Sequence, residues 1–336
     1  MNHSVDIKLD LRINEMLLKH TTSSAPQKQI STGTGKWLVS RRDHAPARSK
    51  LWSAVSVALT LLGCSLPGPQ ADESVADKLR EKRRVNMQGV PGKPEQELSI
   101  LRGGVANGPL LILVHGTPGE AIGWADYLLY PPPGMEVIAL DRPGFGQSSP
   151  EGAVTSLAAQ AEAVAALLPR DGRQVVLLGH SLGGPIVAQV AAMHPDRISA
   201  VVLLAASLDP ELESIHPMQW VGAWSPVRFF LPRAMRNANA ELIALKDELQ
   251  KLRGLLPAIR AKIIIVHGTK DDLVPVANVA YMQARLTGAA CVKTMLLEER
   301  NHFLPWNSVD IVRNAILQAA THATGSENSA ATKEKC

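Results

Sequence analysis

The chain has 336 residues, 46% of them hydrophobic, which is ample for a buried core and excludes disorder along the whole chain. Its formal net charge is +4, and residues 1–63 hold nine Lys and Arg but only four Asp and Glu. The rest of the chain holds 26 Lys and Arg and 27 Asp and Glu. Because the remainder is nearly neutral, we expect no nucleic acid as a partner.

The three cysteines, Cys64, Cys291 and Cys336, lie far apart, and no CxxC or Cys/His pair has the spacing of metal ligands. This usage argues against a disulfide framework and against a structural zinc site. The chain also lacks a GxxxxGK[ST] phosphate loop and a dinucleotide-binding fingerprint. We therefore expect neither a metal nor a cofactor.

Residues 1–63 are interpreted as a leader whose signal-like part spans 36–63. A basic stretch there precedes an apolar run from Leu51 to Leu62, which is too short to cross a bilayer comfortably but suits the apolar region of a secretory signal. The run ends in LLGC and resembles the lipobox of a bacterial lipoprotein. The resemblance implies cleavage before Cys64 and lipidation of Cys64, for instance with palmitate.

Other interpretations of the leader stay open. Leu51–Leu62 also fits a short buried or interfacial helix, and Arg41-Arg42 is weakly similar to a twin-arginine signal. About 35 residues precede the signal-like part, and a translation start nearer Val39 would account for them. Ser65 follows Cys64, and by resemblance to lipoprotein sorting in Gram-negative bacteria this implies an outer-membrane anchor that faces the periplasm.

Residues 64–95 are rich in Pro, Gly and charged residues and are predicted to link the lipid anchor to a folded domain. That domain is expected to span residues 96–325. The last residues, 326–336, are predicted to form a polar tail.

Within the domain, short apolar runs of strand type alternate with helical patterns. Runs typical of strands buried on both faces are Leu110–Val114, Val137–Leu140, Val175–Leu178, Val201–Leu204 and Ile263–Val266, and a last strand is predicted over Val292–Leu297. Ala-rich helical patterns occur between them, at Ser156–Leu168 and Pro185–Met193. This order predicts an α/β fold with a mostly parallel central sheet and helices on both faces.

Polar and Gly-rich motifs follow these runs, at the carboxyl ends where open parallel sheets bind ligands. In chain order they are HGTPG at 115–119, DRPGFGQS at 141–148, GHSLG at 179–183, GTKDDLVP at 268–275 and NH at 301–302. A GxSxG motif after a strand, with HGTPG before it and an acid and a histidine after it, resembles the α/β-hydrolase family over roughly residues 98–323. The resemblance implies an α/β-hydrolase fold and a Ser-His-Asp triad.

Ser181 stands at the nucleophile position of GxSxG. A serine hydroxyl attacks only when it is exposed, is deprotonated by a base and faces donors for the developing oxyanion. Gly179 and Gly183 permit the strained turn that exposes it, and the alternative is an ordinary turn serine. The family's oxyanion hole implies the backbone N–H groups of Leu182 and Thr117 as donors.

His302 follows the last predicted strand, where the family carries its catalytic base. The register of GxxDxxVP assigns the acid that orients this histidine to Asp271, with Asp272 and Asp209 as alternatives. The histidines at 115, 180 and 267 also lie at strand ends and are expected to hydrogen-bond backbone or loop groups. The DRPGFGQS segment resembles a family turn that buttresses the site and is interpreted as structural.

About 55 residues separate the strands at 201–204 and 263–266, which is too many for a simple connection and predicts a small helical cap at about 207–258. The first part of the cap is rich in aromatic residues. Trp220, Trp224 and Phe229 are candidates for lining an acyl pocket, and packing of the cap onto the core is the alternative. Residues 238–252 have the apolar spacing of a helix.

These features predict a serine esterase that cleaves small-molecule carboxylic esters through an acyl-enzyme. Other reactions of the same triad stay open: hydrolysis of C–C bonds, release of N-terminal residues by a peptidase, and acyl transfer. A serine at the elbow argues against the family's dehalogenases and epoxide hydrolases, which use aspartate there. A non-catalytic binding protein on this fold is a further alternative. The membrane is an expected partner through lipidated Cys64, whereas oligomeric state and acyl preference are not predicted.

Overall fold

The structure is a computed structural model that describes residues 73–86 and 95–321. The predicted leader at 1–63, the predicted lipidation site Cys64 and the predicted polar tail at 326–336 lie outside the described residues. Within the described ranges, no helix combines the length and the apolar character that crossing a bilayer requires.

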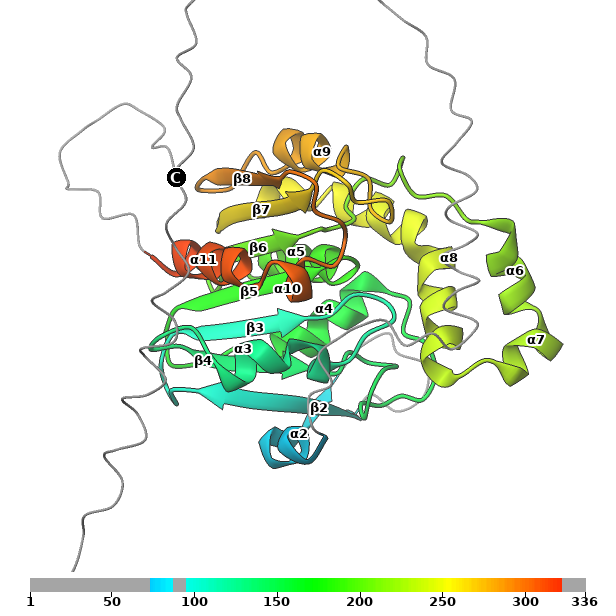
Figure 1. Cartoon of the computed structure of the whole chain (residues 1–336), viewed down its shortest axis with the longest axis horizontal. Coiled ribbons are helices and arrows are strands. Elements are labelled where there is room, and N and C mark those ends of the chain that lie inside the picture. Colours follow the sequence, from blue (N-terminus) through cyan, green and yellow to red (C-terminus); the bar gives the residue numbers. More distant parts are fainter. Residues whose placement is uncertain (1–72, 87–94, 322–336) are drawn as a thin grey trace, which may run out of the picture. The chain divides into compact units, whose positions relative to one another are not determined.

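Eight strands form one sheet in the order β1-β2-β4-β3-β5-β6-β7-β8 (Figure 1). Their bounds are β1 Arg80–Asn86, β2 Glu95–Gly104, β3 Leu110–Val114, β4 Glu136–Leu140, β5 Val175–His180, β6 Ala200–Leu204, β7 Lys262–Gly268 and β8 Val292–Leu297. The pairs β1–β2 and β2–β4 are antiparallel, and the other neighbours are parallel. The mostly parallel sheet that the apolar runs predict is therefore confirmed, and each predicted strand begins and ends within about two residues of the observed one.

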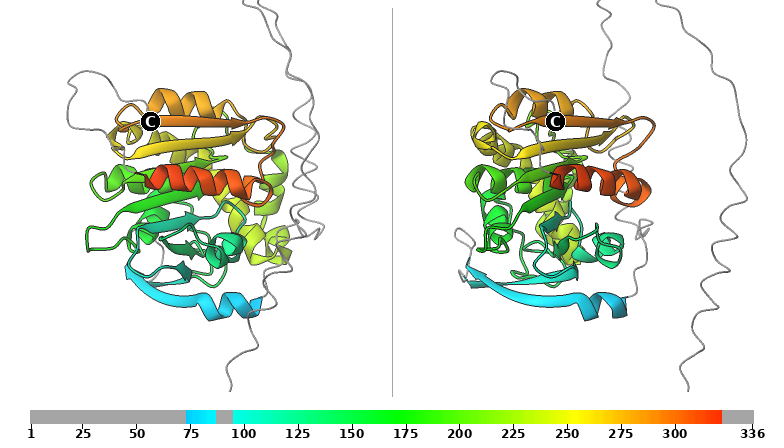
Figure 2. Two further views of the ribbon diagram at one scale, coloured as in Figure 1. Left: turned by 60° about the vertical axis from the view of Figure 1, so that its left-hand side comes forward. Right: turned by 90° about the vertical axis from the view of Figure 1, so that its left-hand side faces the viewer.

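Helices cover both faces of the sheet (Figure 2). Their bounds are α2 Glu73–Leu79, α3 Ala125–Leu129, α4 Leu157–Ala165, α5 Gly183–Met193, α6 Pro217–Ala223, α7 Ser225–Phe230, α8 Arg233–Arg253, α9 Asn278–Arg285, α10 Leu304–Asn307 and α11 Val309–Ala320, with short 3-10 turns at Ala121–Trp124 (η1) and Leu256–Ala258 (η2). Helices α3 and α11 pack on one face, and α4, α5, α8 and α9 pack on the other. The helices predicted at 156–168 and 185–193 are α4 and α5.

Two separate cores result from the alternation of side chains along each strand. In β3, Leu110, Ile112 and Val114 point to the face covered by α4 and α5, whereas Leu111 and Leu113 point to the face covered by α3 and α11. Every residue of β3 is buried, which explains why this strand reads as an unbroken apolar run rather than as an alternating pattern.

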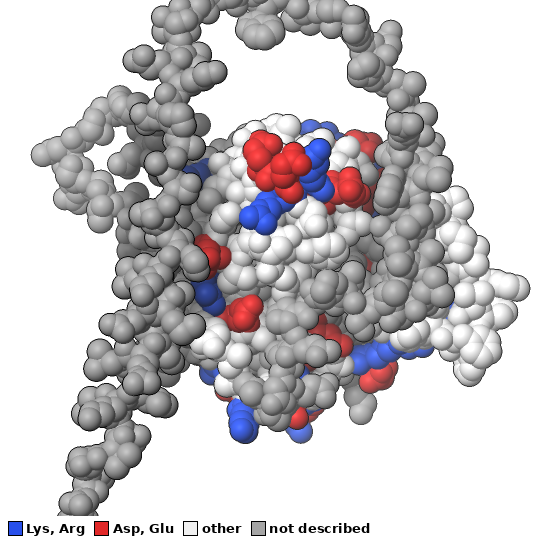
Figure 3. Space-filling view, viewed as in Figure 1, with Lys and Arg blue, Asp and Glu red and all other residues white. Residues whose placement is uncertain are grey.

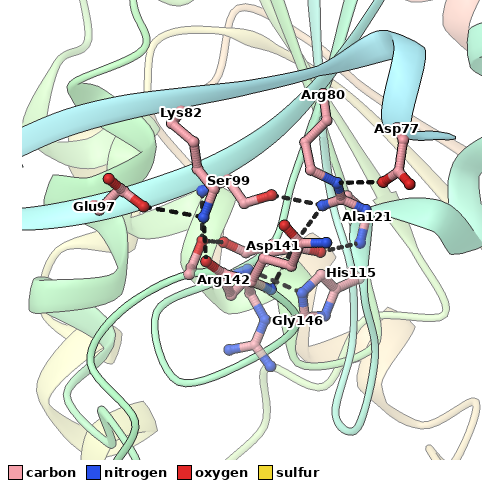
Figure 4. A network of polar contacts seen from close by, with 12 residues as sticks. Asp77, Arg80, Lys82, Glu97, Ser99, His115, Ala121, Asp141, Arg142 and Gly146 are labelled. Atoms are coloured by element: carbon pink, nitrogen blue, oxygen red, sulfur yellow. Dashed lines mark hydrogen bonds and ion pairs between the residues drawn. The ribbon is translucent and has the colours of Figure 1, made fainter.

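The prediction that residues 64–95 form a linker is wrong for residues 73–86, which form α2 and the edge strand β1. Strand β1 has the sequence REKRRVN and buries only Val85, so its charged side chains hide the strand in the sequence. Charged edge strands are common because they block pairing with other chains. The strand is also held by Arg80, whose Nη1 lies 2.9 Å from Oδ2 of the buried Asp141 and 2.6 Å from Oγ of Ser99 (Figure 4).

The predicted cap is present between β6 and β7 as helices α6, α7 and α8. The long helix α8 buries Leu245, Leu249 and Leu252 against the core formed with α4 and α5. Asn239 Nδ2 of α8 donates to Gln219 O of α6 at 2.8 Å, which joins the cap helices to one another.

Cys291 lies just before β8 and is disulfide-bonded. The chain's other two cysteines, Cys64 and Cys336, lie outside the described residues. The cysteine spacing argues against a framework of several disulfides, and one disulfide does not contradict that. The spacing does not predict this single disulfide either.

Candidate active site

Ser181 lies in the tight turn between β5 and α5. Its φ is +55°, in the left-handed region that residues other than glycine avoid. The turn is held because Ser181 N donates to Leu204 O of β6 at 3.0 Å and Ser181 O accepts from Gly184 N at 2.9 Å. A Cβ on Gly183 would lie 2.3 Å from Val114 O, so only glycine fits beside β3. The Ser181 hydroxyl has no hydrogen-bond partner among the described residues.

Asp271 and His302 form a hydrogen-bonded pair at the ends of β7 and β8. His302 Nδ1 and Asp271 Oδ2 are 2.8 Å apart, and both side chains are buried. Asp271 Oδ1 accepts the backbone N–H groups of Leu273 at 3.0 Å and Val274 at 2.8 Å, which fixes the carboxylate. Because the carboxylate accepts, Nδ1 carries the proton and Nε2 of His302 is left as an acceptor.

The two alternative acids do not contact His302. Asp272 is exposed, and Asp209 Oδ1 accepts the backbone N–H of Glu211 at 3.0 Å within its own turn. Of the three candidate aspartates, the structure brings only Asp271 to the histidine.

His180 ends β5, next to Ser181, and packs against His302. His180 Nε2 donates to the backbone O of His302 at 3.0 Å, and the two ring centroids are 4.7 Å apart. Burial, with a contribution from His302, lowers the pKa of His180 from 6.5 to about 3, so this ring is neutral at neutral pH. The sequence predicts a backbone hydrogen bond for His180, but nothing in its neighbourhood indicates that the acceptor belongs to His302.

The loop that carries His302 is fastened to the segment after HGTPG. Trp306 Nε1 donates to Gly123 O at 2.9 Å, and the Tyr127 hydroxyl donates to Pro305 O at 2.9 Å. These contacts join loops that are far apart in the sequence, so the positions of the histidine and of the loop after β3 depend on each other.

The loop after β3 lies directly against Ser181. A Cβ on Gly116 would lie 2.8 Å from Ser181 Cβ and 3.4 Å from its Oγ, so the backbone approaches the serine as closely as glycine allows. The backbone N–H groups of Thr117 and Leu182 donate to no other group in the described part of the chain. Thr117 Oγ1 is also buried without a partner there. Two free backbone donors thus flank the serine.

Arg142, in the DRPGFGQS turn, forms a fully buried ion pair with Glu241 of cap helix α8. Arg142 Nη1 lies 2.7 Å from Glu241 Oε1, and Nη2 lies 3.0 Å from Oε2, so the pair is bidentate. Gln160 of α4 donates to the same Glu241 at 3.1 Å. The sequence predicts only helical packing for the segment that carries Glu241, because a lone glutamate on an amphipathic helix gives no sign of its partner.

Arg142 also holds the backbone beside the serine. Its Nη2 donates to Gly116 O at 2.9 Å, and His115 Nδ1 donates to the same carbonyl at 2.8 Å. Because a peptide group is planar, fixing the Gly116 carbonyl fixes the direction of the Thr117 N–H. Burial, followed by the Arg142 charge, lowers the pKa of His115 well below its usual value, so this ring is a neutral hydrogen-bonding group.

The prediction that Trp220, Trp224 and Phe229 line a pocket is wrong. Their exposed fractions are 58%, 65% and 80%, because α6 and α7 stand away from the sheet and turn these rings to solvent. The alternative, that they pack the cap onto the core, fails for the same reason. Among the described residues, no group of three His, Cys, Asp or Glu side chains is placed to hold a metal ion.

Residues 109–241 match the family model of the α/β-hydrolase fold. The domain has the α/β-hydrolase fold. The chain is 28% identical over 236 residues to the pimeloyl-(acyl-carrier protein) methyl ester esterase of Aeromonas hydrophila, an alignment that covers 58% of this chain and 89% of the esterase.

A second relative of the chain is only partly covered by the alignment. The chain is 37% identical over 199 residues to the dihydrolipoyllysine-residue acetyltransferase component of the acetoin cleaving system of Cupriavidus necator. This alignment covers 50% of this chain. The chain spans about half, 53%, of the length of that protein.

Solved structures share the fold of this chain at low sequence identity. A bacterial membrane phospholipase A has a TM-score of 0.54 and 21% identity over 81% of this chain and 97% of the other. The enol-lactonase of Burkholderia xenovorans has a TM-score of 0.55 and 18% identity over 71% of this chain and 100% of the other. At these identities the likeness concerns the fold alone.

Replacing Glu241 by Gln leaves the Arg142 charge buried without its counter-charge. We expect the free energy of unfolding, measured by urea denaturation, to fall by about 3 kcal/mol. The double variant Arg142→Met/Glu241→Leu removes both charges and is expected to recover most of that loss. Glu211→Gln breaks an exposed pair with Lys246 and should cost no more than about 0.5 kcal/mol. Equal losses for Glu241→Gln and Glu211→Gln would contradict this account.

The neutral His180 makes stability depend on pH. Below pH 6.5 the unfolded chain takes up a proton at this histidine and the folded chain does not, so the free energy of unfolding falls as the pH falls. From pH 7 to pH 5 this one residue contributes a loss of about 2 kcal/mol. In His180→Gln, the free energy of unfolding measured by urea denaturation should fall less between pH 7 and pH 5, by that same amount. In His194→Gln, which changes a partly exposed histidine, the difference should be smaller. An unchanged slope in His180→Gln would refute the assignment.

Proposed function

We propose that the protein is a serine hydrolase that cleaves carboxylic esters through an acyl-enzyme. The observation that carries the proposal is the hydrogen bond between His302 and Asp271, made at the same end of the sheet as a serine held at positive φ. The serine, the histidine and the aspartate are the three groups that nucleophilic acyl transfer needs.

In this proposal each residue has one role. Ser181 Oγ attacks the ester carbonyl while Nε2 of His302 takes the hydroxyl proton. The same nitrogen then gives that proton to the leaving alcohol, and Asp271 holds the ring in the tautomer that this transfer requires. A water molecule, activated by His302, cleaves the acyl-enzyme and regenerates Ser181.

The backbone N–H groups of Thr117 and Leu182 are proposed to stabilise the oxyanion. Both lack another partner among the described residues, and donors that are already oriented stabilise the developing charge without reorganisation during the reaction. Arg142 and His115 act here as positioning residues, because their bonds to the Gly116 carbonyl orient the Thr117 N–H.

Ester hydrolysis is favoured over other acyl chemistry by the relative with the greater coverage, which is named as a methyl ester esterase. Acyl transfer is the second candidate, because the other reported relative is named as an acetyltransferase component. An acyl-enzyme on Ser181 serves both reactions, and they differ in whether water or another nucleophile receives the acyl group.

The esterase proposal is tested by turnover of short-chain p-nitrophenyl esters. Ser181→Ala, His302→Ala and Asp271→Asn should each lower kcat/KM roughly a thousandfold or more. Asp272→Asn is the matched control, since its side chain is exposed, and it should retain activity. A fluorophosphonate should label the wild type and Asp272→Asn but not Ser181→Ala. Absence of both turnover and labelling in the wild type would refute the proposal, and acyl transfer to added alcohols faster than hydrolysis would favour the second candidate.

We also propose that Cys64 is lipidated and that the enzyme is anchored in the bacterial cell envelope, at the outer membrane and facing the periplasm. The support is the LLGC sequence that ends the apolar run 51–62. Mass spectrometry of the mature N-terminus should find an acylated cysteine at position 64, and Cys64→Ala should abolish the acylation. An unmodified N-terminus upstream of residue 51 would remove both the anchor and the location.

A further inference from the structure

The outer side of the cap carries a cluster of exposed apolar side chains, here called the aromatic cap face. Its members lie just before α6, on α6, between α6 and α7, and on α7, and they are Ile215, Met218, Trp220, Val221, Trp224, Phe229 and Phe230. Phe230 is 83% exposed, the most of any large hydrophobic side chain in the described ranges. Figure 3 shows the lobe where Figure 1 places α6 and α7 as largely uncharged surface.

The aromatic cap face exposes a large apolar area to water. Four aromatic rings, each more than half exposed, present roughly 500 Å² of apolar area to water. A patch of this size on a soluble domain usually marks a binding surface. Helix α7 also buries none of its residues, although a helix of this length has little stability of its own in water. Contact with an apolar phase would supply the burial that α7 lacks.

Within the segment that carries the aromatic cap face, the charged residues have one sign. Between Glu213 and Glu241 the chain carries three arginines and no acidic residue. Arg233 is engaged by Glu151 and by backbone carbonyls, whereas the side chains of Arg228 and Arg236 make no ion pair with any described residue. The face therefore complements a negatively charged surface.

We propose that the aromatic cap face docks on the surface of an anionic phospholipid bilayer, independently of any acyl chain on Cys64. Trp and Phe side chains partition into the region between lipid head groups and acyl chains, and nearby arginines attract anionic head groups. A second copy of the chain is less suited to the same face, because symmetric pairing would bring the Arg228 side chains of both copies into an apolar interface. The proposal goes beyond ester hydrolysis and does not depend on it.

Helix α8 lies between the sheet and the helices α6 and α7 (Figure 1), so docking would bring the bilayer to the side of α8 away from the sheet. Helix α6, which carries Trp220, is bonded through Gln219 to Asn239 of α8, two residues before Glu241. The membrane-facing helices and the helix that supports the site are thus parts of one cap.

The test uses the full chain with Cys64→Ala, so that no acyl chain contributes, and sedimentation with vesicles. Vesicles of phosphatidylcholine mixed with phosphatidylglycerol should bind the protein more tightly than phosphatidylcholine alone. Changing Trp220, Trp224, Phe229 and Phe230 together to Ser should lower the partition coefficient at least roughly tenfold. Changing Arg228 to Gln should lower it about fivefold on the anionic vesicles only.

A matched control changes three exposed apolar residues outside the cap, Val105, Tyr130 and Leu296, to Ser, and this variant should bind like the parent. Urea denaturation should show that the cap and control variants are equally folded. Equal binding by the parent and the cap variant would overturn the proposal.

Tryptophan fluorescence gives a second, local readout. Brominated phospholipids should quench a parent that carries Trp37→Phe and Trp52→Phe, so that no tryptophan of residues 1–63 contributes. The quenching should largely disappear when Trp220 and Trp224 are also changed to Phe, which keeps the apolar face but removes these two fluorophores. Persistent quenching in that variant would place the lipid contact elsewhere and overturn the proposal. So would a concentration-dependent dimer, seen by analytical ultracentrifugation without lipid, that the four-serine cap variant abolishes, because the face would then bind a second copy.

Discussion

The buried ion pair between Arg142 and Glu241 is the interaction on which the arrangement of the site depends. Charges withdrawn from water are tolerated when their hydrogen-bonding groups are satisfied. Arg142 also donates to the carbonyl of Gly116, and Glu241 also accepts from Gln160. This network joins the loop after β3, the turn after β4, helix α4 and cap helix α8. The cap cannot shift without moving the backbone that lies against Ser181.

The cap consequently has two chemically different sides. Its inner side, on α8, is polar where it meets Arg142 and apolar where Leu245 and Leu249 join the core. Its outer side, on α6 and α7, carries exposed aromatic rings and Arg228, which makes no ion pair with any described residue. One short insertion between β6 and β7 therefore supports the site from within and offers a surface for a lipid bilayer outside, and the two roles use different residues.

Two errors of the sequence analysis share a physical cause. The charged residues of β1 conceal a strand, because an edge strand buries little and needs no apolar run. The aromatic residues of the cap suggest a pocket, because apolar side chains are usually buried, yet here they face solvent. Residue type predicts burial only when the neighbours of a segment are known, and at the edge of the sheet and in the cap those neighbours are remote in the sequence.

The sequence by itself determined the strands of the parallel sheet and the sharp turn at Ser181, because each depends on local pattern: unbroken apolar runs and glycines at fixed offsets. Only the tertiary structure decided that Asp271, rather than Asp209, meets His302, that His180 packs on that ring, and that Glu241 balances Arg142. These pairings join residues on different elements. The first two arise when parallel strands bring their carboxyl ends to one edge, and the third arises when cap helix α8 meets the turn after β4. No local pattern encodes either geometry.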